Sequence, residues 1–259
     1  MGLYLMQGRG KNYLKTIIPI PIWNALRIIL NRKNVKITKE YQSVKLNFVM
    51  TRLHISKFAE IHNKFASLDK HLNFDVEKTR LRTYNVVSFC NLALHYSARY
   101  KLKGDIVTCG VSFGTAPLVM THNLKSQIKG RTLFLVDPFL GAENSSNTKR
   151  LRNYNLDSEL VLKRMPEGLD VVVIRDFLSP KTIKKFGKIA FAHLNTTDFK
   201  AEMESIPELY KKLLMGGFII MDLYGWLSAE NQRKVDELLT LCGAESFELV
   251  TRQLVIYKP

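Results

Sequence analysis

A glycine-containing turn and four isolated polar residues follow the apolar runs in the second half of the chain. The turn, CGVSFGT, occupies residues 109–115, and the polar residues that end later runs are Asp137, Asp176, Asn195 and Asp222. Glycines let a backbone approach a ligand closely, and a turn that opens a helix leaves amide groups free to donate. A carboxylate after the next strand, as at Asp137, can accept both hydroxyls of a ribose. Together the turn and Asp137 favour an adenosine-containing ligand over a bare strand-to-helix turn beside a solvent-exposed acid.

Alternating strand and helix patterns from Gly104 onward must position these residues. Short apolar, β-branched runs predict five strands, at residues 105–111, 131–139, 169–177, 188–195 and 218–224. Helical patterns separate them, at residues 115–128 and 156–165, from Pro180 for a short stretch, and at 198–215 and 228–241. Gly216 and Gly217 are predicted to stop the helix before the fifth strand. Two final runs, at 246–250 and 253–258, are separated by two residues, which predicts an antiparallel hairpin.

This order of elements is typical of a parallel sheet that helices cover on both faces. Continuously apolar strands are buried on both sides, and crossovers of helical length join parallel strands. We therefore predict an α/β fold, a Rossmann-like, doubly wound, mostly parallel sheet that ends in an antiparallel hairpin. Ligands of such sheets bind beyond the carboxyl ends of the strands, where the turn and the four polar residues would meet.

The first part of the chain differs in charge from the rest. The protein carries 39 basic and 23 acidic residues, and residues 1–103 hold 19 of the basic but only 5 of the acidic ones. This excess indicates either a surface that faces an anionic partner or a solvated, lysine-rich exterior. We predict that residues 1–80 form a basic, mainly helical cap over the carboxyl edge of the sheet, ahead of a second unit at 81–259.

An apolar helix that begins at Pro21 is predicted at residues 21–30, within this extension. The apolar stretch 16–30 contains Pro19, Pro21 and Arg27, and it falls short of the roughly 20 apolar residues that a bilayer-spanning helix needs. The helix could pack on the protein, or it could lie at a membrane surface with residues 16–36 in contact with lipid. We predict packing. Further on, the pattern predicts a short strand at 44–50, a helix that contains Phe58 and Phe65, and another helix at 83–100.

The cysteines and histidines indicate neither disulfides nor a metal site. The three cysteines, Cys90, Cys109 and Cys242, are widely spaced and odd in number, so we expect a reducing compartment and a cytoplasmic protein. The histidines near the N-terminus lack a second ligand type at metal spacing, which indicates ordinary surface or core residues: His54, His62, His71 and His95.

Five blocks of the sequence resemble those of a known family. The segment GDIVTCGVSFGTAPLVM at 104–120 is similar to the cofactor-binding opening of class I S-adenosylmethionine-dependent methyltransferases. More narrowly, it resembles the macrocin O-methyltransferase family, which methylates sugars and small molecules. The other family blocks have counterparts here in DPFLG at 137–141, HLNTTDF at 193–199, GGFIIMDLYG at 216–225 and TRQLVIYKP at 251–259.

The resemblance implies S-adenosylmethionine as the cofactor and gives individual residues a role. Cofactor binding would fall to the turn and to the carboxylates after the second and third strands: Cys109, Gly110, Val111, Gly114, Thr115, Asp137 and Asp176. Asp222 and the block at 193–199 would face the acceptor. The candidate bases for the acceptor's hydroxyl proton are His193, Asp198 and Asp222. His193 could instead be a buried structural histidine.

Four residues depart from the family's pattern. Thr108 replaces an acidic residue, Asn195 and Thr197 stand where the family has two metal-binding aspartates, and Leu223 replaces the second aspartate of a pair. Magnesium prefers a carboxylate-rich site, whereas the implied ligands here, Asp222 and Asn195, include one carboxylate. Either methyl transfer proceeds without a metal, through a side-chain base, or the protein has lost activity.

The resemblance implies an O-methyltransferase that transfers a methyl group from S-adenosylmethionine to a hydroxyl of a sugar or small molecule. The alternative is a catalytically impaired protein of the same fold that binds an anionic polymer or a membrane through its basic N-terminal region. As partners we expect a small-molecule or glycan acceptor and no nucleic acid. A homo-oligomer and a peripheral membrane contact are left open.

Overall fold

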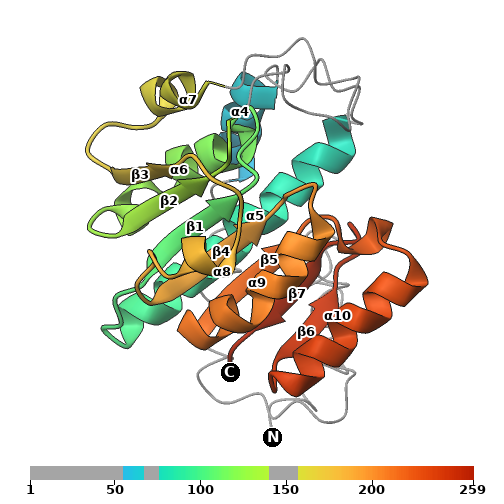
Figure 1. The fold of residues 1–259 in the computed structure, drawn as a ribbon. Helices are drawn as coiled ribbons and strands as arrows, with labels where there is room; N and C mark the ends of the chain where they lie inside the picture. Colours follow the sequence, from blue (N-terminus) through green and yellow to red (C-terminus); the bar gives the residue numbers. More distant parts are fainter. Residues whose placement is uncertain (1–54, 67–75, 140–156) are drawn as a thin grey trace, which may run out of the picture.

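A seven-stranded sheet forms the centre of the protein. The computed structural model describes residues 55–66, 76–139 and 157–259 (Figure 1). The strands are β1 (Asp105–Cys109), β2 (Thr132–Val136), β3 (Asp170–Ile174), β4 (Ile189–Leu194), β5 (Leu213–Met221), β6 (Glu245–Glu248) and β7 (Leu254–Tyr257). Their order is β3-β2-β1-β4-β5-β7-β6, with β1 to β5 parallel and β7 antiparallel to both of its neighbours. The predicted doubly wound sheet with a terminal antiparallel hairpin is confirmed.

Helices cover both faces of this sheet. They are α4 (Ile55–Ala66), α5 (Val76–Arg99), α6 (Thr115–Ile128), α7 (Ser158–Arg164), α8 (Pro180–Ile183), α9 (Phe199–Lys212) and α10 (Ala229–Leu241), with a 3-10 turn at Tyr224–Trp226. The view in Figure 1 has α8, α9 and α10 in front of the sheet and α5 and α6 behind it. The direction of winding changes between β1 and β4, so the switch point of the sheet lies where these two strands end.

Two apolar cores lie on the two faces of the sheet. Successive residues of a strand point to opposite faces, so Ile106 packs with α5 and α6 while Val107 packs with α9. The same alternation in β5 sends Ile220 to the first core and Met221 to the second. The strands are therefore apolar throughout because both of their faces are covered.

The structure extends the fold further toward the N-terminus than the sequence indicated. The helix predicted to contain Phe58 and Phe65 is α4, and it packs on α6. The helix predicted at 83–100 begins at Val76, so the predicted boundary between 80 and 81 falls inside α5. The predictions for residues 21–30 and 44–50, and most of the predicted cap, lie outside the described residues. Within the described ranges, no helix is long and apolar enough to cross a bilayer.

The two glycines at 216 and 217 do not end a helix, and that prediction is wrong. Helix α9 stops at Lys212 and β5 starts at once, so both glycines lie within the strand. Gly216 has φ +70°, and the ring of Tyr96 on α5 occupies the place where a side chain would point. The register between β4 and β5 is irregular at this point. The glycines therefore form a bulge in β5, and this bulge lets α5 approach the sheet closely.

The hairpin is longer at its tip than predicted. Glu248 pairs with Leu254, so five residues, 249–253, connect the strands in place of two. Leu249 donates its amide to the carbonyl of Gln253 at 2.8 Å, and Arg252 adopts a positive φ of 64°. The amide side chain of Gln253 is thereby turned into the protein, where it is fully buried.

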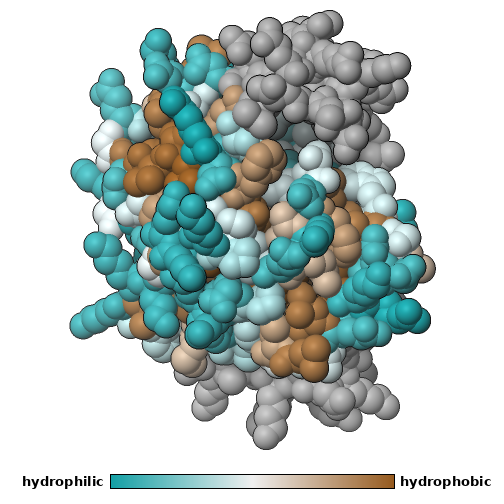
Figure 2. All heavy atoms as spheres, viewed as in Figure 1, coloured by the Kyte–Doolittle hydropathy of each residue, from teal (hydrophilic) through white to brown (hydrophobic). Residues whose placement is uncertain are grey.

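The outer side of β3 is partly apolar. Leu160, Leu162 and Val172 are exposed, and Figure 2 shows hydrophobic atoms gathered where α7 and β3 lie in Figure 1. Because β3 is the edge strand of the parallel half, its burial pattern is looser than that of the fully buried β4. Three strands, β2, β1 and β4, separate this edge from β5.

We predict that Gly216→Ala destabilises the protein more than Gly130→Ala. Both residues have a positive φ, but a Cβ at 216 would collide with Tyr96, whereas no atom lies within 4 Å of a Cβ at 130. The backbone cost of about 1–2 kcal/mol is common to both, and overpacking adds about 1–3 kcal/mol at 216 alone. Urea unfolding of the two variants measures the difference. Equal losses of unfolding free energy would show that the contact with Tyr96 costs nothing.

Candidate active site

The glycine turn after β1 is held against the ends of the neighbouring strands. Gly110 donates its amide to the carbonyl of Val136 in β2 at 2.9 Å, and the amide of Asn195 after β4 donates to Cys109 at 2.9 Å. Gly110 has φ +78°, and a side chain there would collide with the carbonyl of Asn195. Glycine is thus required by the close approach of two strand ends at the switch point.

Asp137 joins this turn to the loop after β2. One carboxylate oxygen accepts the amide of Ser112 at 3.0 Å, and the other accepts the amide of Phe139 at 2.8 Å. Ser112 and Phe139 both have positive φ values, 52° and 47°, which side chains rarely adopt. Asp137 therefore fixes two unusual backbone conformations at once. Each of its oxygens keeps a lone pair that can accept a ribose hydroxyl.

The amino end of α6 has no side-chain cap within the described part of the chain. Its N-cap is Gly114 with φ +87°. Pro117 lacks an amide hydrogen, so the amides of Thr115 and Ala116 are the free donors of the first turn. These donors, the left-handed turn and Asp137 fit the carboxylate and ribose ends of the predicted cofactor.

Three residues predicted to bind the cofactor have side chains that face the protein instead. Cys109 is fully buried, and burial raises the pKa of its thiol. Val111 belongs to the apolar core, and the hydroxyl of Thr115 lies 3.4 Å from the carbonyl of Phe65 on α4. These residues can therefore serve the cofactor only through their backbone.

Asp176 lies just after β3, beside the end of β2, where the amide of Asp137 donates to the carbonyl of Ile174 at 3.1 Å. Its carboxylate accepts the amide of Phe177 at 2.8 Å, so it orders its own loop. Two strands, β2 and β1, separate β3 from β4, where the acceptor side of the site was predicted.

Asp222 is buried at the end of β5 among three polar side chains. Its Oδ1 accepts the amide of Gln253 at 2.5 Å, while its Oδ2 lies 3.3 Å from Nε2 of His193 and 3.5 Å from Nη2 of Arg82. Burial alone would raise the pKa of this carboxyl, but His193, Arg82 and Gln253 together lower it below its ordinary value. Both oxygens of Asp222 are thus engaged, and the carboxylate is a weak base.

His193 is 1% exposed and points at Asp222. The 3.3 Å contact has ion-pair distance without hydrogen-bond geometry, and Nδ1 has no hydrogen-bond partner among the described residues. The predicted candidates His193 and Asp222 are therefore brought together as a buried pair.

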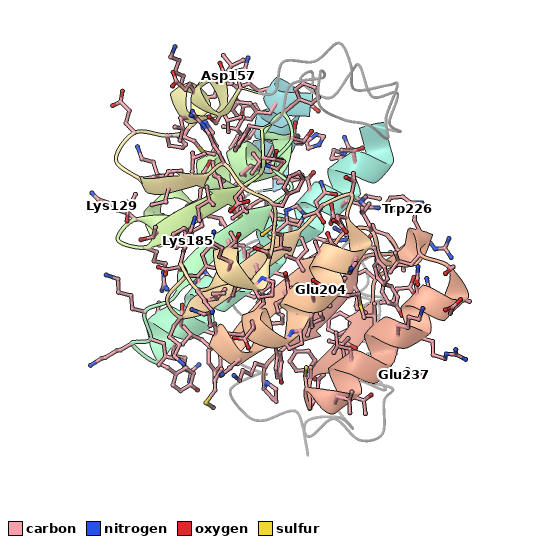
Figure 3. The ribbon with its side chains drawn as sticks, in the orientation of Figure 1. Lys129, Asp157, Lys185, Glu204, Trp226 and Glu237 are labelled. Carbon is pink, nitrogen blue, oxygen red and sulfur yellow. The ribbon has the colours of Figure 1, made fainter. Side chains whose placement is uncertain are left out.

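The sequence did not single out Arg82 and Gln253. Gln253 accepts from Asn85 at 2.8 Å and from Thr251 at 2.7 Å while it donates to Asp222. Arg82 also donates to the backbone carbonyl of Asp222, and its guanidinium lies 4.1 Å above the ring of Trp226, which Figure 3 labels beyond the end of β5. A signal for Gln253 existed in the C-terminal block of the family. Arg82 could be found only by folding α5 against β5.

The residues around Asp222 do not fit a magnesium ion. Asn195 and Thr197 are neutral, Leu223 is apolar, and the side chains that face Oδ2 of Asp222 are those of Arg82 and His193. In the described part of the chain, no group of three histidine, cysteine or acidic side chains could hold a metal. Magnesium binds through carboxylates and water, and a guanidinium 3.5 Å from the one carboxylate repels it.

The loop after β4 is organised by two acids of α9. Asp198 is exposed and caps the helix, accepting the amide of Ala201 at 3.0 Å, so the structure gives this predicted base a local role. Glu202 is 2% exposed and accepts both the amide and the hydroxyl of Thr196, at 2.8 and 2.9 Å. Burial raises the pKa of Glu202 to about 7. Sequence reasoning missed Glu202 because an acid one turn inside a helix is usually a surface residue.

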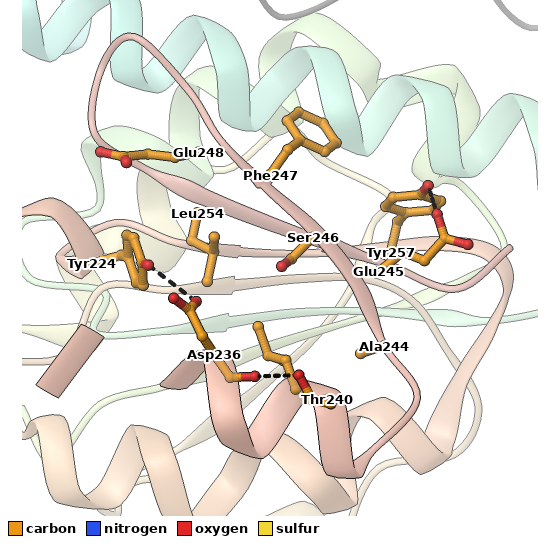
Figure 4. Close-up of a pocket in the computed structure, with 11 residues that line it drawn as sticks. Tyr224, Asp236, Thr240, Ala244, Glu245, Ser246, Phe247, Glu248, Leu254 and Tyr257 are labelled. Atoms are coloured by element: carbon orange, nitrogen blue, oxygen red, sulfur yellow. Dashed lines mark hydrogen bonds between the residues drawn. The ribbon is translucent and has the colours of Figure 1, made fainter. Parts of the chain in front are cut away.

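A separate cavity of about 460 Å³ lies between α10 and the β6–β7 hairpin (Figure 4). Its polar walls are acidic and phenolic, with Asp236, Glu245 and Glu248 facing Tyr224 and Tyr257. Tyr224 donates to Asp236 at 3.1 Å, and Tyr257 donates to Glu245. None of the predicted site residues lines this cavity, so it is distinct from the edge that carries Asp137 and Asp222.

We predict that Glu202→Gln removes a pH-dependent loss of stability. Between its ordinary pKa of 4.5 and its raised pKa of about 7, the folded protein holds a proton that the unfolded chain releases. Stability therefore falls as the pH rises through this window and stays low above it. The isosteric glutamine avoids this, so the variant should match the wild type at pH 5 and exceed it by about 3 kcal/mol at pH 8.

Urea unfolding across this pH range measures the effect. Glu204→Gln is the matched control, because Glu204 lies exposed on the same helix, 3.8 Å from Lys200 (Figure 3). A stability difference between Glu202→Gln and the wild type that does not change with pH would contradict the prediction.

Comparisons with known proteins agree with the predicted family. The sequence matches the family Macrocin-O-methyltransferase (TylF) over residues 90–238, more than half of the chain. No curated protein sequence matches it significantly. The solved structure of the O-methyltransferase NovP is similar over 68% of this chain and 79% of its own, with a TM-score of 0.51 and 16% identity. That likeness concerns the fold alone.

A second solved structure, the calicheamicin methyltransferase CalS11, covers 77% of this chain and 91% of its own at 14% identity, with a TM-score of 0.48. The family assignment depends on the sequence match over residues 90–238, and the likeness to NovP concerns the fold. The matched residues include the glycine turn, Asp137, His193 and Asp222, which lie at the carboxyl edge of the sheet. The chain belongs to the macrocin O-methyltransferase (TylF) family and has the Rossmann-like fold of class I S-adenosylmethionine-dependent methyltransferases.

Proposed function

We propose that this protein transfers a methyl group from S-adenosylmethionine to a hydroxyl of a sugar or another small molecule. The observation that carries the proposal is the bond between the Ser112 amide and Asp137, 3.0 Å long, which joins the glycine turn to a carboxylate at the carboxyl edge. A turn with free amides beside such a carboxylate suits a ligand with an amino-acid end and a ribose. Membership of the family supports the hydroxyl as acceptor.

The switch point brings the two halves of the proposed site together. The turn after β1 touches Asn195 after β4, and the amide of Asp222 after β5 donates to Leu194 at 2.8 Å. A cofactor held by the ends of β1 and β2 therefore lies beside an acceptor held by the ends of β4 and β5. Such proximity replaces a random encounter by a held geometry, which lowers the barrier of a transfer reaction.

We infer that His193, paired with Asp222, accepts the proton that the acceptor's hydroxyl loses. When bound, S-adenosylmethionine supplies an electrophilic methyl group, and the acceptor oxygen must lose its proton as it attacks. Asp198 is committed to capping α9, and both oxygens of Asp222 already accept from donors. His193 has ring nitrogens without hydrogen-bond partners in the described chain, and its Nε2 lies 3.3 Å from Oδ2 of Asp222, so it remains the candidate base.

We predict that Asp137→Ala weakens the binding of S-adenosylhomocysteine at least tenfold. The substitution removes acceptors for the ribose and releases the Ser112 and Phe139 amides that Asp137 holds. Isothermal titration calorimetry with the wild type and the variant measures the loss. Asp170→Ala is the control, because Asp170 lies at the opposite end of β3 and binds Thr132.

Failure of the wild type to bind either S-adenosylmethionine or S-adenosylhomocysteine at millimolar concentration would overturn the proposed function. An equal loss of affinity in the Asp170→Ala control would show that the effect of Asp137→Ala is not local.

We predict that His193→Gln slows methyl transfer by about 10²- to 10⁴-fold, the range for loss of a general base. Affinity for S-adenosylhomocysteine should stay unchanged, because His193 lies on the acceptor side of the site. The assay follows a radiolabelled methyl group from S-adenosylmethionine onto a panel of sugars and small hydroxylated molecules. A variant that methylates at the wild-type rate would remove His193 from the mechanism.

A further inference from the structure

We propose that Arg82 supplies, from within the chain, the positive charge that a divalent metal would otherwise bring to Asp222, so that this site works without a metal. The inference rests on the proposed function for its use in catalysis, but its physical content concerns the charges around Asp222 alone. It starts from the disagreement between the metal that the family implies and the side chains that surround Asp222 in this protein.

Contacts with Asp222 and Trp226 hold the side chain of Arg82 in one position. Its Nη2 lies 3.5 Å from Oδ2 of Asp222 and donates to the backbone carbonyl of the same residue. The guanidinium lies 4.1 Å from the centre of the Trp226 ring, which adds a cation–π contact on one side. Gln253 donates to Oδ1 of Asp222, and its amide nitrogen lies 3.3 Å from the carbonyl of Arg82. The cation and its counter-charge are thus held together by α5, the end of β5 and the connection of the β6–β7 hairpin.

Arg82 already supplies a cation beside Asp222 without a metal. Asp222 carries one negative charge, Arg82 carries one positive charge, and His193 lies on the same carboxylate oxygen as Arg82. Glu202, the nearby acid on α9, is engaged with Thr196 and has its pKa raised to about 7. A divalent ion beside Asp222 would add two positive charges next to a guanidinium that cannot lose its proton.

At three positions where the family's pattern has acidic residues, this protein has uncharged ones. Asn195 and Thr197 follow β4 and Leu223 follows Asp222, and none of them offers a charged ligand. The site thus has fewer carboxylates than the family's pattern, and a guanidinium lies beside the remaining one. The guanidinium then holds the carboxylate of Asp222 in place beside His193.

Manganese binding to the full-length protein tests the proposal directly, since Mn²⁺ can be followed by electron paramagnetic resonance without any acceptor. The wild type should bind no Mn²⁺ in an Asp222-dependent manner, with or without S-adenosylhomocysteine. Its thermal midpoint should be the same in Mg²⁺ and in EDTA. Binding of Mn²⁺ by the wild type that disappears in Asp222→Asn would overturn the proposal.

Two combined variants separate the role of Arg82 from that of the missing carboxylates. Asn195→Asp with Leu223→Asp restores acidic ligands but keeps Arg82, and the second variant adds Arg82→Met. We expect the triple variant to bind Mn²⁺ at least tenfold more tightly than the double variant. Equal affinities would show that Arg82 does not exclude a metal.

If the combined variants do not fold, a double-mutant cycle still measures the interaction between Arg82 and Asp222. Arg82→Met and Asp222→Asn should each lower the unfolding midpoint, and together they should cost clearly less than the sum of the two, because each alone leaves the other charge unpaired. Additive losses would overturn the pairing. Calorimetry with S-adenosylhomocysteine decides the proposed function separately, since neither manganese binding nor this cycle depends on it.

Discussion

A single buried carboxylate organises the end of β5 and the elements around it. Asp222 ends a central strand where water is nearly excluded, being 8% exposed, and an ionised group there is tolerated only if partners neutralise it. Those partners come from three other elements: Arg82 from α5, His193 from β4 and Gln253 from the hairpin. The need to satisfy one charge therefore fixes how the helix, the sheet and the hairpin tip meet. It also accounts for the long hairpin connection, which turns Gln253 inward.

The cofactor side follows the same principle with backbone donors. Asp137 is also buried, and it is satisfied by the amides of Ser112 and Phe139, both held at positive φ. The carboxylate compensates for two strained conformations, and those conformations shape the turn at the switch point. Because the turn also touches Asn195, the two buried acids lie on either side of one contact between β1 and β4. Pre-organisation of this kind lowers the cost of binding a flexible ligand.

The protein belongs to the family but departs from its pattern at the positions implied to bind a metal. The charged and polar groups around Asp222 make the two observations compatible. The residues that shape the cofactor turn are retained, whereas the positions implied to bind a metal carry Asn195, Thr197 and Leu223. Arg82 and His193 surround the remaining acid. Glu202 adds a group with a pKa of about 7 that ties the loop after β4 to α9. The acceptor edge of this protein therefore has a polar environment of its own within a common fold.

The sequence by itself determined the sheet, its winding and its reactive edge, because apolar periodicity and turn residues are local properties of the chain. It placed the turn at 109–115, Asp137, His193 and Asp222 correctly at strand ends. It mistook Gly216 for the end of a helix, since only the packing of Tyr96 distinguishes a bulge from a cap. It also could not find Arg82 or Glu202. Arg82 lies 140 positions from Asp222, and Glu202 is buried by elements distant in sequence. Only the tertiary structure could decide which charges share a buried space.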